Sequence, residues 1–186
     1  MSNECKDYIE DLKNSPVGTE DYNRWLCHKY HWLIPRNHWT DDELEEYDYK
    51  YTELDAMPDG WLVAFGEQMC EEIQKVLEKA NYVDKYRILQ IKEKWGYLHW
   101  YSNGIPSEIS DEYWSIIRKY EDLSARTCFI CGKPATKIST GWICPWCDDC
   151  ADKHGYDIFI PIEDWFKKQN EPIKDGEIYI LSIEPK

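Results

Sequence analysis

Apolar residues at helical spacing predict one long helix directly after the sequence "MPDG". Over about 20 residues an apolar side chain returns every three or four positions, which is the period of one face of an α-helix. The stripe consists of Trp61, Phe65, Met69, Ile73, Val76, Leu77 and Ala80. Asp59 is expected to be the N-cap, because its carboxylate can accept a backbone N–H that has no partner inside the helix. We therefore place this apolar face in the core.

The same period predicts a second long helix at residues 107–125. Ser107 or Ser110 is expected to cap it, and the helix then leads directly to Cys128. Its buried stripe is predicted to consist of Ile109, Tyr113, Ile116, Tyr120 and Leu123. Both long helices are therefore predicted to bury one apolar face.

Shorter helices are predicted in the first part of the chain. Near the N-terminus, Tyr8, Ile9 and Leu12 fall on one side of a helix, and Thr19 is the expected N-cap of the next one. A connector broken by proline, "HWLIPRNHW", follows. Thr40 is then expected to begin another short helix, since acidic residues in a first turn favour helix formation.

Between the two long helices the period changes from helical to alternating. Residues 86–95, "YRILQIKEKW", and 97–101, "YLHWY", both alternate, with Gly96 between them. This pattern is typical of two paired strands joined by a tight turn. Residues 176–185, "GEIYILSIEP", are also predicted to be a strand. Helices combined with a small antiparallel sheet define the expected fold class as α+β.

The charge distribution argues against binding to duplex nucleic acid. The net charge is −14, and residues 1–84 carry 8 basic and 20 acidic residues, whereas residues 85–137 carry 9 basic and 6 acidic ones. Binding to duplex nucleic acid requires a basic footprint, so it is not expected of this chain. An acidic face can instead engage a basic partner or mimic DNA, and the locally basic middle third can hold a small anion.

Nothing in the sequence predicts association with a membrane. No stretch approaches the roughly 20 apolar residues that span a bilayer, and the N-terminus lacks the basic and apolar regions of a secretory signal. A cytoplasmic location is therefore expected. In that compartment the eight cysteines are expected to be thiols rather than disulfides.

Five cysteines near the C-terminus predict a zinc site with two possible registers. The first pair is Cys128 and Cys131, and the second is either Cys147 with Cys150 or Cys144 with Cys147. Both spacings suit a structural four-cysteine zinc site. The acids around Cys147 and Cys150 favour the first register, because they resemble the start of a helix. The element is expected to be of treble-clef or zinc-ribbon type, and Cys144 is its alternate ligand.

Three sequence blocks together resemble a family of small uncharacterised proteins that is common in phages and prophages. The blocks are "MPDGWLVAFGEQMCEEI", "ILQIKEKWGYLHWY" and the cysteine-containing stretch that begins "SARTCFICGKPA". They cover roughly residues 57–152. The resemblance points to Asp59, Gly60, Trp61, Lys94, Gly96, Leu98, Tyr101, Cys128, Cys131, Cys147 and Cys150. It implies the Cys147 and Cys150 register and a phage origin, but no activity. His99 departs from the family, which usually has arginine there.

The block "ILQIKEKWGYLHWY", which contains both predicted strands, is also predicted to provide the ligand-binding surface. Aromatic rings beside cations can stack on a base and hold a phosphate. The residues chosen on this ground are Lys92, Lys94, Trp95, His99 and Trp100. None of the sequence motifs that mark nucleotide hydrolysis, zinc proteolysis or serine hydrolysis is present.

These observations predict one compact unit with four parts. They are a helical segment at 1–56, a helix–hairpin–helix core at 57–127, the zinc element at 128–155 and an extended or strand segment at 156–186. The expected function is that of a non-catalytic, zinc-stabilised binding protein of phage type that counteracts a host factor or defence system in the host cytoplasm. Its predicted partner is a small nucleotide-type signal or a host protein. An acidic DNA-mimic inhibitor and an unrecognised hydrolase or nuclease are the alternatives.

Overall fold

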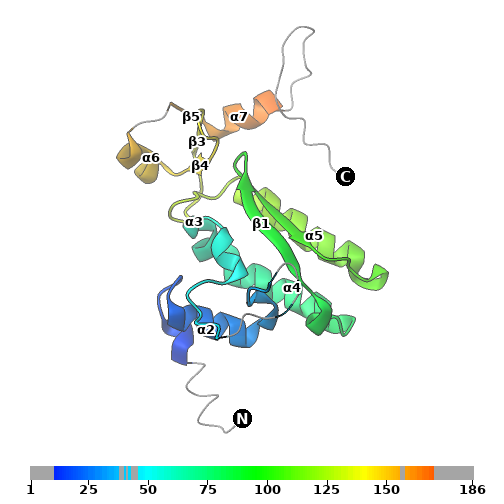
Figure 1. Ribbon diagram of the computed structural model, residues 1–186. Helices are drawn as coiled ribbons and strands as arrows, with labels where there is room; N and C mark the ends of the chain where they lie inside the picture. Colours follow the sequence, from blue (N-terminus) through cyan, green and yellow to red (C-terminus); the bar gives the residue numbers. More distant parts are fainter. Residues whose placement is uncertain (1–10, 38–39, 41, 43–45, 156–157, 170–186) are drawn as a thin grey trace.

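The protein has an α+β architecture with two small antiparallel sheets (Figure 1). The computed structural model describes residues 11–37, 40, 42, 46–155 and 158–169. The helices of these ranges are α2 (Glu20–Lys29), α3 (Asp59–Trp61), α4 (Glu67–Lys79), α5 (Ser107–Ser124), α6 (Asp148–His154) and α7 (Ile162–Gln169). The strands are β1 (Ile88–Lys94), β2 (Tyr97–Ser102), β3 (Lys137–Ser139), β4 (Pro145–Trp146) and β5 (Phe159–Pro161). None of the described helices has the length and apolar character that a membrane span requires.

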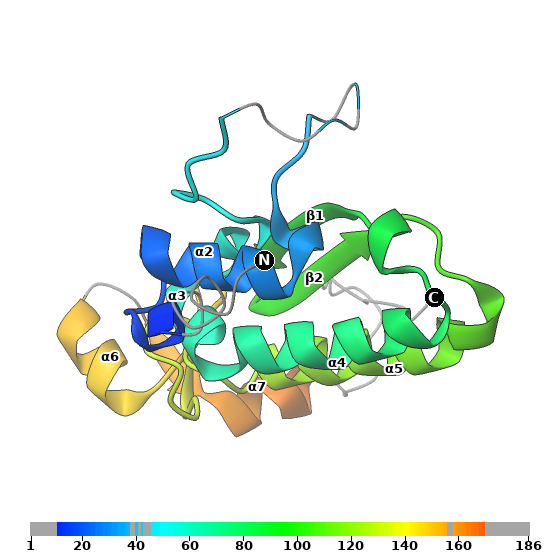
Figure 2. The ribbon, with the colours of Figure 1, turned by 90° about the horizontal axis from the view of Figure 1, so that it is seen from below.

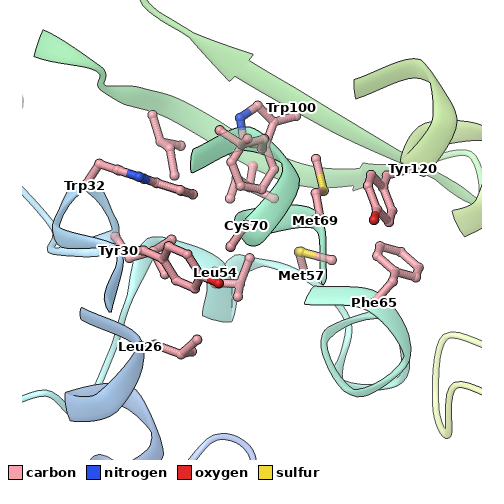
Figure 3. Close-up of a cluster of buried hydrophobic side chains, with 14 of the residues drawn as sticks. Leu26, Tyr30, Trp32, Leu54, Met57, Phe65, Met69, Cys70, Trp100 and Tyr120 are labelled. Carbon is pink, nitrogen blue, oxygen red and sulfur yellow. The ribbon is translucent and has the colours of Figure 1, made fainter. Parts of the chain in front are cut away.

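The main core lies between the hairpin β1–β2 and a layer of helices. Figure 2 shows α4 and α5 side by side, with α2 near the other side of α4. The long helix predicted from residue 59 is present as α3, a π-helical stretch at Leu62–Gly66 and α4. Its apolar stripe is buried from Trp61 to Leu77, as predicted. Figure 3 shows part of the resulting cluster, which brings Phe65 and Met69 near Tyr120.

Buried tyrosine and tryptophan rings satisfy their polar atoms through one another. The Tyr86 and Tyr113 hydroxyls lie 2.8 Å apart, and Trp100 Nε1 donates to the Tyr86 hydroxyl at 2.8 Å. Tyr113 also donates to Ser102 Oγ at 2.9 Å. A buried polar atom without a partner is costly, so these bonds explain how a core rich in tyrosine and tryptophan is built with few phenylalanines.

The buried stripe of α5 differs from the prediction at two positions. Ile117 and Ser124 are buried, whereas Leu123 is exposed and Ile116 is half-buried. The reason is that Ser124 lies against the edge of β2, where its Oγ accepts the backbone N–H of Leu98 at 2.8 Å. A buried backbone donor needs an acceptor. For this reason the polar Ser124 is buried in α5, whereas the apolar pattern had predicted that its neighbour Leu123 would be buried.

The predicted helix starts are partly confirmed. Thr19 is the N-cap of α2, and its Oγ1 accepts the N–H of Tyr22. Asp59 and Ser107 are instead the first residues of α3 and α5, and the N-caps are the preceding prolines. The short helix expected from Thr40 falls largely outside the described residues. The described part contains a 3-10 helix at Glu53–Ala56, which begins with a capping box between Thr52 and Asp55.

The C-terminal segment expected to be extended contains a helix in its described part. Residues 158–169 form β5 followed by α7. Isoleucine, tryptophan and phenylalanine at helical spacing after Pro161 explain this helix, and Ile162 is its buried residue. The strand predicted for residues 176–185 and the helical side at Tyr8 and Ile9 lie outside the described residues.

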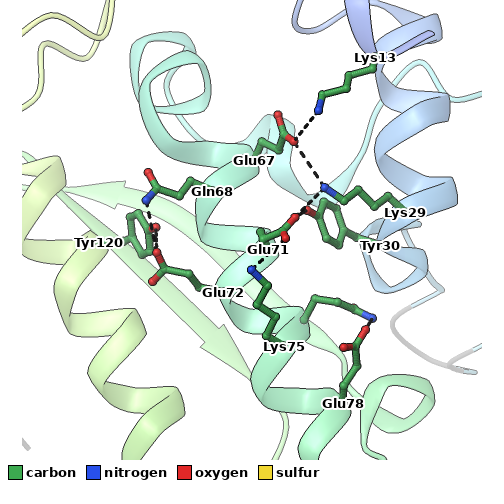
Figure 4. A network of polar contacts seen from close by, with 11 residues as sticks. Lys13, Lys29, Tyr30, Glu67, Gln68, Glu71, Glu72, Lys75, Glu78 and Tyr120 are labelled. Carbon is green, nitrogen blue, oxygen red and sulfur yellow. Dashed lines mark hydrogen bonds and ion pairs between the residues drawn. The ribbon is translucent and has the colours of Figure 1, made fainter. Parts of the chain in front are cut away.

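Carboxylates on α4 form ion pairs with lysines from four elements, and Figure 4 shows three of these lysines. Glu71 accepts from Lys29 at 2.7 Å and from the Tyr30 hydroxyl at 3.0 Å, and it pairs with Lys75 at 3.0 Å. Hydrogen bonds from Lys29, Lys75 and Tyr30 lower the pKa of Glu71 to about 2. This network joins α2 to α4 at the surface.

Replacing Glu71 with glutamine is expected to lower the stability at neutral pH by about 0.5–1 kcal/mol, since solvent screens exposed ion pairs. The folded-state pKa lies below the unfolded value of about 4.3, so the stabilisation is present above about pH 5 and is lost as the pH falls toward 2. Urea denaturation of both proteins at several pH values measures this difference. A Glu71→Gln effect that is as large at pH 2 as at pH 7 would contradict this assignment. Glu78→Gln, which removes the same charge from the last turn of α4, is the control.

Candidate metal centre

Four cysteines converge to the geometry that a tetrahedral metal ion requires. The Sγ atoms of Cys128, Cys131, Cys147 and Cys150 all lie within 4.8 Å of one another, and those of Cys131 and Cys147 are 3.5 Å apart. Zinc–sulfur bonds of about 2.3 Å place tetrahedral sulfurs about 3.8 Å apart, so the spacing suits a metal ion. It is too long for a disulfide, whose S–S bond is about 2.05 Å.

The first pair of cysteines lies on a tight backbone turn. The N–H of Gly132 donates to the carbonyl oxygen of Cys128 at 2.9 Å, and the N–H of Cys128 donates to the carbonyl of Lys133 at 2.8 Å. Gly132 has a φ of 76°, a backbone conformation that favours glycine. This turn holds the sulfurs of Cys128 and Cys131 on the same side, as the sequence predicted.

The second pair lies at the start of α6. Cys147 is the N-cap residue, and Cys150 lies in the first turn, so the helix backbone fixes their separation. Asp148 and Asp149 occupy the positive end of the helix, where negative charge is favourable. They pair with Lys137 at 3.1 Å and with Lys133 at 2.7 Å respectively, which ties this helix to the rest of the cysteine element.

The electrostatic environment distinguishes three of the thiols, those of Cys131, Cys147 and Cys150. The backbone N–H of Lys133 is the main cause that lowers the pKa of Cys131, to about 7. Burial raises the pKa values of Cys147 and Cys150. A thiolate is the form that binds a metal, and this environment favours the thiolate of Cys131 over those of Cys147 and Cys150.

Cys144 is not part of the four-sulfur cluster. It is buried and packs with Trp146 and Ala151 in a small apolar cluster. Its backbone N–H donates to Ser139 Oγ at 3.1 Å. The four sulfurs that lie together are therefore those of the register with Cys147 and Cys150 as the second pair. Cys144, the alternate ligand, lies in the neighbouring apolar cluster.

The first cysteine turn packs directly against the start of α3. The N–H of Gly60 donates to the carbonyl of Phe129 at 3.0 Å, and Trp61 Nε1 donates to the carbonyl of Thr127 at 2.9 Å. A Cβ atom added to Gly60 would lie 2.7 Å from the nitrogen of Gly132 and closer still to the carbonyl oxygen of Cys128. The resemblance to phage and prophage proteins pointed to Gly60 and Trp61. It did not predict that these residues contact the cysteine element.

The tip of the β1–β2 hairpin contacts the same element. Trp95 and Gly96 both have positive φ values, 60° and 81°, which form the two-residue turn predicted for this position. A Cβ atom on Gly96 would lie 3.4 Å from the carbonyl oxygen of Ile143, and Trp142 Nε1 donates to Glu93 at 3.2 Å. Three separate sequence blocks therefore meet at the cysteine element, which lies beside α3 in Figure 1.

The five predicted ligand residues do not form one surface. Lys92 and His99 are paired across the hairpin, and Lys94 is exposed on the same strand face. Trp100 lies in the core and donates to Tyr86, so it is not on the hairpin face that carries Lys92 and His99. Trp95 belongs to the turn. Burial, and then the charges of Lys94 and Lys92, lower the pKa of His99, which disfavours the imidazolium as an anion ligand.

Comparison with known proteins identifies no relative. No protein-family model, no curated protein and no solved structure matches the chain significantly. The relation to phage and prophage proteins therefore stays a prediction from the three sequence blocks.

Proposed function

We propose that this chain is a non-catalytic binding protein of phage type in which a zinc ion has a structural role. Cys128, Cys131, Cys147 and Cys150 would hold the ion, in an arrangement of treble-clef type that combines a tight turn with the first turn of α6. The support is the sulfur geometry of the four residues. Zinc with four thiolate ligands has no open position for water or substrate, so the ion would stabilise the fold and take no part in a reaction.

The surface that the metal would hold in place presents two large apolar side chains. Trp142 is 73% exposed and Ile158 is 76% exposed. Both lie at the end of β3, since Ser139 Oγ donates to the Trp142 carbonyl and Thr140 donates to the Ile158 carbonyl. Tryptophan is enriched among residues that dominate the energy of protein interfaces. The partner that this surface suits is a host protein with an apolar cleft that can accept an indole.

The pattern of surface charge favours this apolar contact over mimicry of DNA. Carboxylates on α4 and α5 are interleaved with lysines, as in the pairs Glu72–Lys119 and Glu112–Lys79. A protein that mimics DNA needs a run of negative charge with the spacing of phosphates. The described residues of these two helices carry basic as well as acidic side chains, which weakens a field of that kind.

Replacing Trp142 with alanine is expected to weaken binding of the host partner at least tenfold, because it removes the largest exposed apolar group at the end of β3. Wild-type and variant proteins are used to capture partners from host lysate, and titration calorimetry with the purified partner then measures affinity. Trp114→Ala, which removes a partly exposed tryptophan from α5, is the control. Equal loss in both variants, or capture of the same partner by Trp142→Ala with full affinity, would contradict the proposal.

A further inference from the structure

The β1–β2 hairpin has an outer face that takes no part in the main core. Residues directly opposite each other in an antiparallel pair lie on the same face, so the strand register assigns every side chain to a face. Ile91, Leu98 and Trp100 are buried and define the inner face, and Figure 2 shows α4 and α5 on one side of the hairpin. The outer face consists of Gln90, Lys92, Lys94, Tyr97, His99 and Tyr101.

This outer face carries a column of aromatic rings beside a column of polar side chains. Every second residue of β2, from Tyr97 to Tyr101, contributes a ring, and alternate residues of a strand are about 7 Å apart. The residues opposite them on β1, from Gln90 to Lys94, contribute one amide and two ammonium groups. One ring and one polar group are therefore repeated three times along the hairpin.

The rings of the outer face are arranged so that flat groups can pack on them. The rings of His99 and Tyr101 are nearly parallel, with an interplanar angle of 15° and centroids 6.3 Å apart. Lys92 Nζ lies 5.0 Å from the Tyr101 centroid and donates to Gln90 at 2.7 Å. Tyr101 is 44% exposed. A tyrosine exposed to this extent offers ring surface to a base, and every base has a face that can stack on it.

The charge of the outer face is positive although the chain is acidic. The net charge is −14, but none of the six outer side chains is a carboxylate, and Lys94 is exposed. Burial, and then the charges of Lys94 and Lys92, lower the pKa of His99. Both ammonium groups therefore act on the same imidazole, which stays neutral. The rings supply stacking surface, and the two lysines supply the positive charge.

We propose that the outer face of the hairpin binds a single-stranded nucleic acid. Bases would pack on the rings of β2, and Lys92 and Lys94 would contact phosphates. A chain that repeats a flat base and a phosphate matches two parallel columns, whereas a mononucleotide can use only one ring and one cation. In a duplex the bases stack on one another, so their faces are not available to these rings.

The proposed site is separate from the apolar surface at Trp142. The Trp142 indole contacts Glu93, whose side chain is on the inner face because Glu93 is paired with the buried Leu98. Binding of a nucleic acid by the outer face therefore does not depend on the function proposed above.

Fluorescence anisotropy of the full chain with a labelled single strand of about ten uridines tests the proposal. Thymidine DNA of the same length, a duplex of that length and UMP are the comparison ligands. The single strand is expected to bind at least about tenfold more tightly than the duplex or UMP, since each additional stacked base adds affinity. Two phosphate contacts predict that log K falls with log salt concentration with a slope of about −1.4.

Matched variants separate the outer face from general attraction. Tyr101→Ala is expected to weaken binding of the single strand at least about fivefold, and Tyr101→Phe to retain it, because the ring stacks. Tyr51→Ala removes a tyrosine that is 47% exposed elsewhere and should leave affinity unchanged. Lys94→Gln is expected to reduce the salt slope by about 0.7, whereas Lys168→Gln, which removes an exposed charge from α7, should not change it.

The outcomes divide clearly. Absence of measurable binding to the wild-type chain, equal effects of Tyr101→Ala and Tyr51→Ala, or a duplex that binds as tightly as the single strand would overturn the assignment. Binding of RNA and DNA strands alike supports a site for single strands of either kind, and a preference for one of them supports the site and identifies its source. Thermal unfolding of each variant verifies that a loss of affinity does not arise from unfolding.

Discussion

Replacing Gly60 with alanine is expected to destabilise the protein by about 3 kcal/mol or more. The added methyl group would lie 2.7 Å from backbone atoms of both Phe129 and Gly132. Backbone atoms cannot move aside as the end of a flexible side chain can, so the whole cysteine turn would have to shift. The hydrogen bond between the Gly60 N–H and the Phe129 carbonyl would be lost with it.

Gly104→Ala is the matched control, because a Cβ atom there meets nothing within 4 Å. Its effect is expected to stay within about 0.5 kcal/mol. Urea denaturation of both variants gives the free energies of unfolding, and measurement of bound zinc shows whether the cysteine turn still forms. A Gly60→Ala protein as stable as Gly104→Ala would show that α3 does not pack against this turn.

Replacing one of the four clustered cysteines is expected to have the second large effect. In small zinc domains the metal contributes on the order of 10 kcal/mol to folding, so a site with three thiolates should lose stoichiometric zinc and become much less stable. Cys131→Ala tests this with the least disturbance to packing, since Cys131 is half-buried, whereas Cys128 is fully buried.

Cys144→Ala provides the comparison that separates the two registers. It should retain one zinc ion per chain and cost about 1 kcal/mol, the effect of removing a small buried group. Zinc content by elemental analysis and thermal unfolding report both effects. Loss of zinc in Cys144→Ala, with retention in a Cys150→Ala protein, would reverse the register.

The periodic parts of the fold could be predicted from the sequence because local pattern determines them. The long helix from residue 59, the hairpin around Gly96 and the N-cap at Thr19 all rest on residues close together in the chain. The convergence of Cys128, Cys131, Cys147 and Cys150 was also predictable, since the spacing of the two pairs suits a tetrahedral site. These features need no knowledge of distant contacts.

The features that were not predicted depend on contacts between distant segments. Ser124 is buried because β2 needs an acceptor there, and an apolar stripe carries no signal for that. Trp100 alternates with exposed residues in the sequence, but the alternation alone did not decide which face of the hairpin meets the helices. A glycine followed by tryptophan at a helix start was the available signal for the contact of Gly60 and Trp61, since glycine often marks close backbone approach.

Native mass spectrometry of the purified protein, before and after denaturation, tests whether the four clustered cysteines hold a structural zinc ion. We expect a mass excess of one zinc ion per folded chain that is released on unfolding, together with four thiols that alkylating reagents modify only after release. A folded protein without zinc, with Cys128, Cys131, Cys147 and Cys150 all open to alkylation, would contradict the assignment of a structural zinc site.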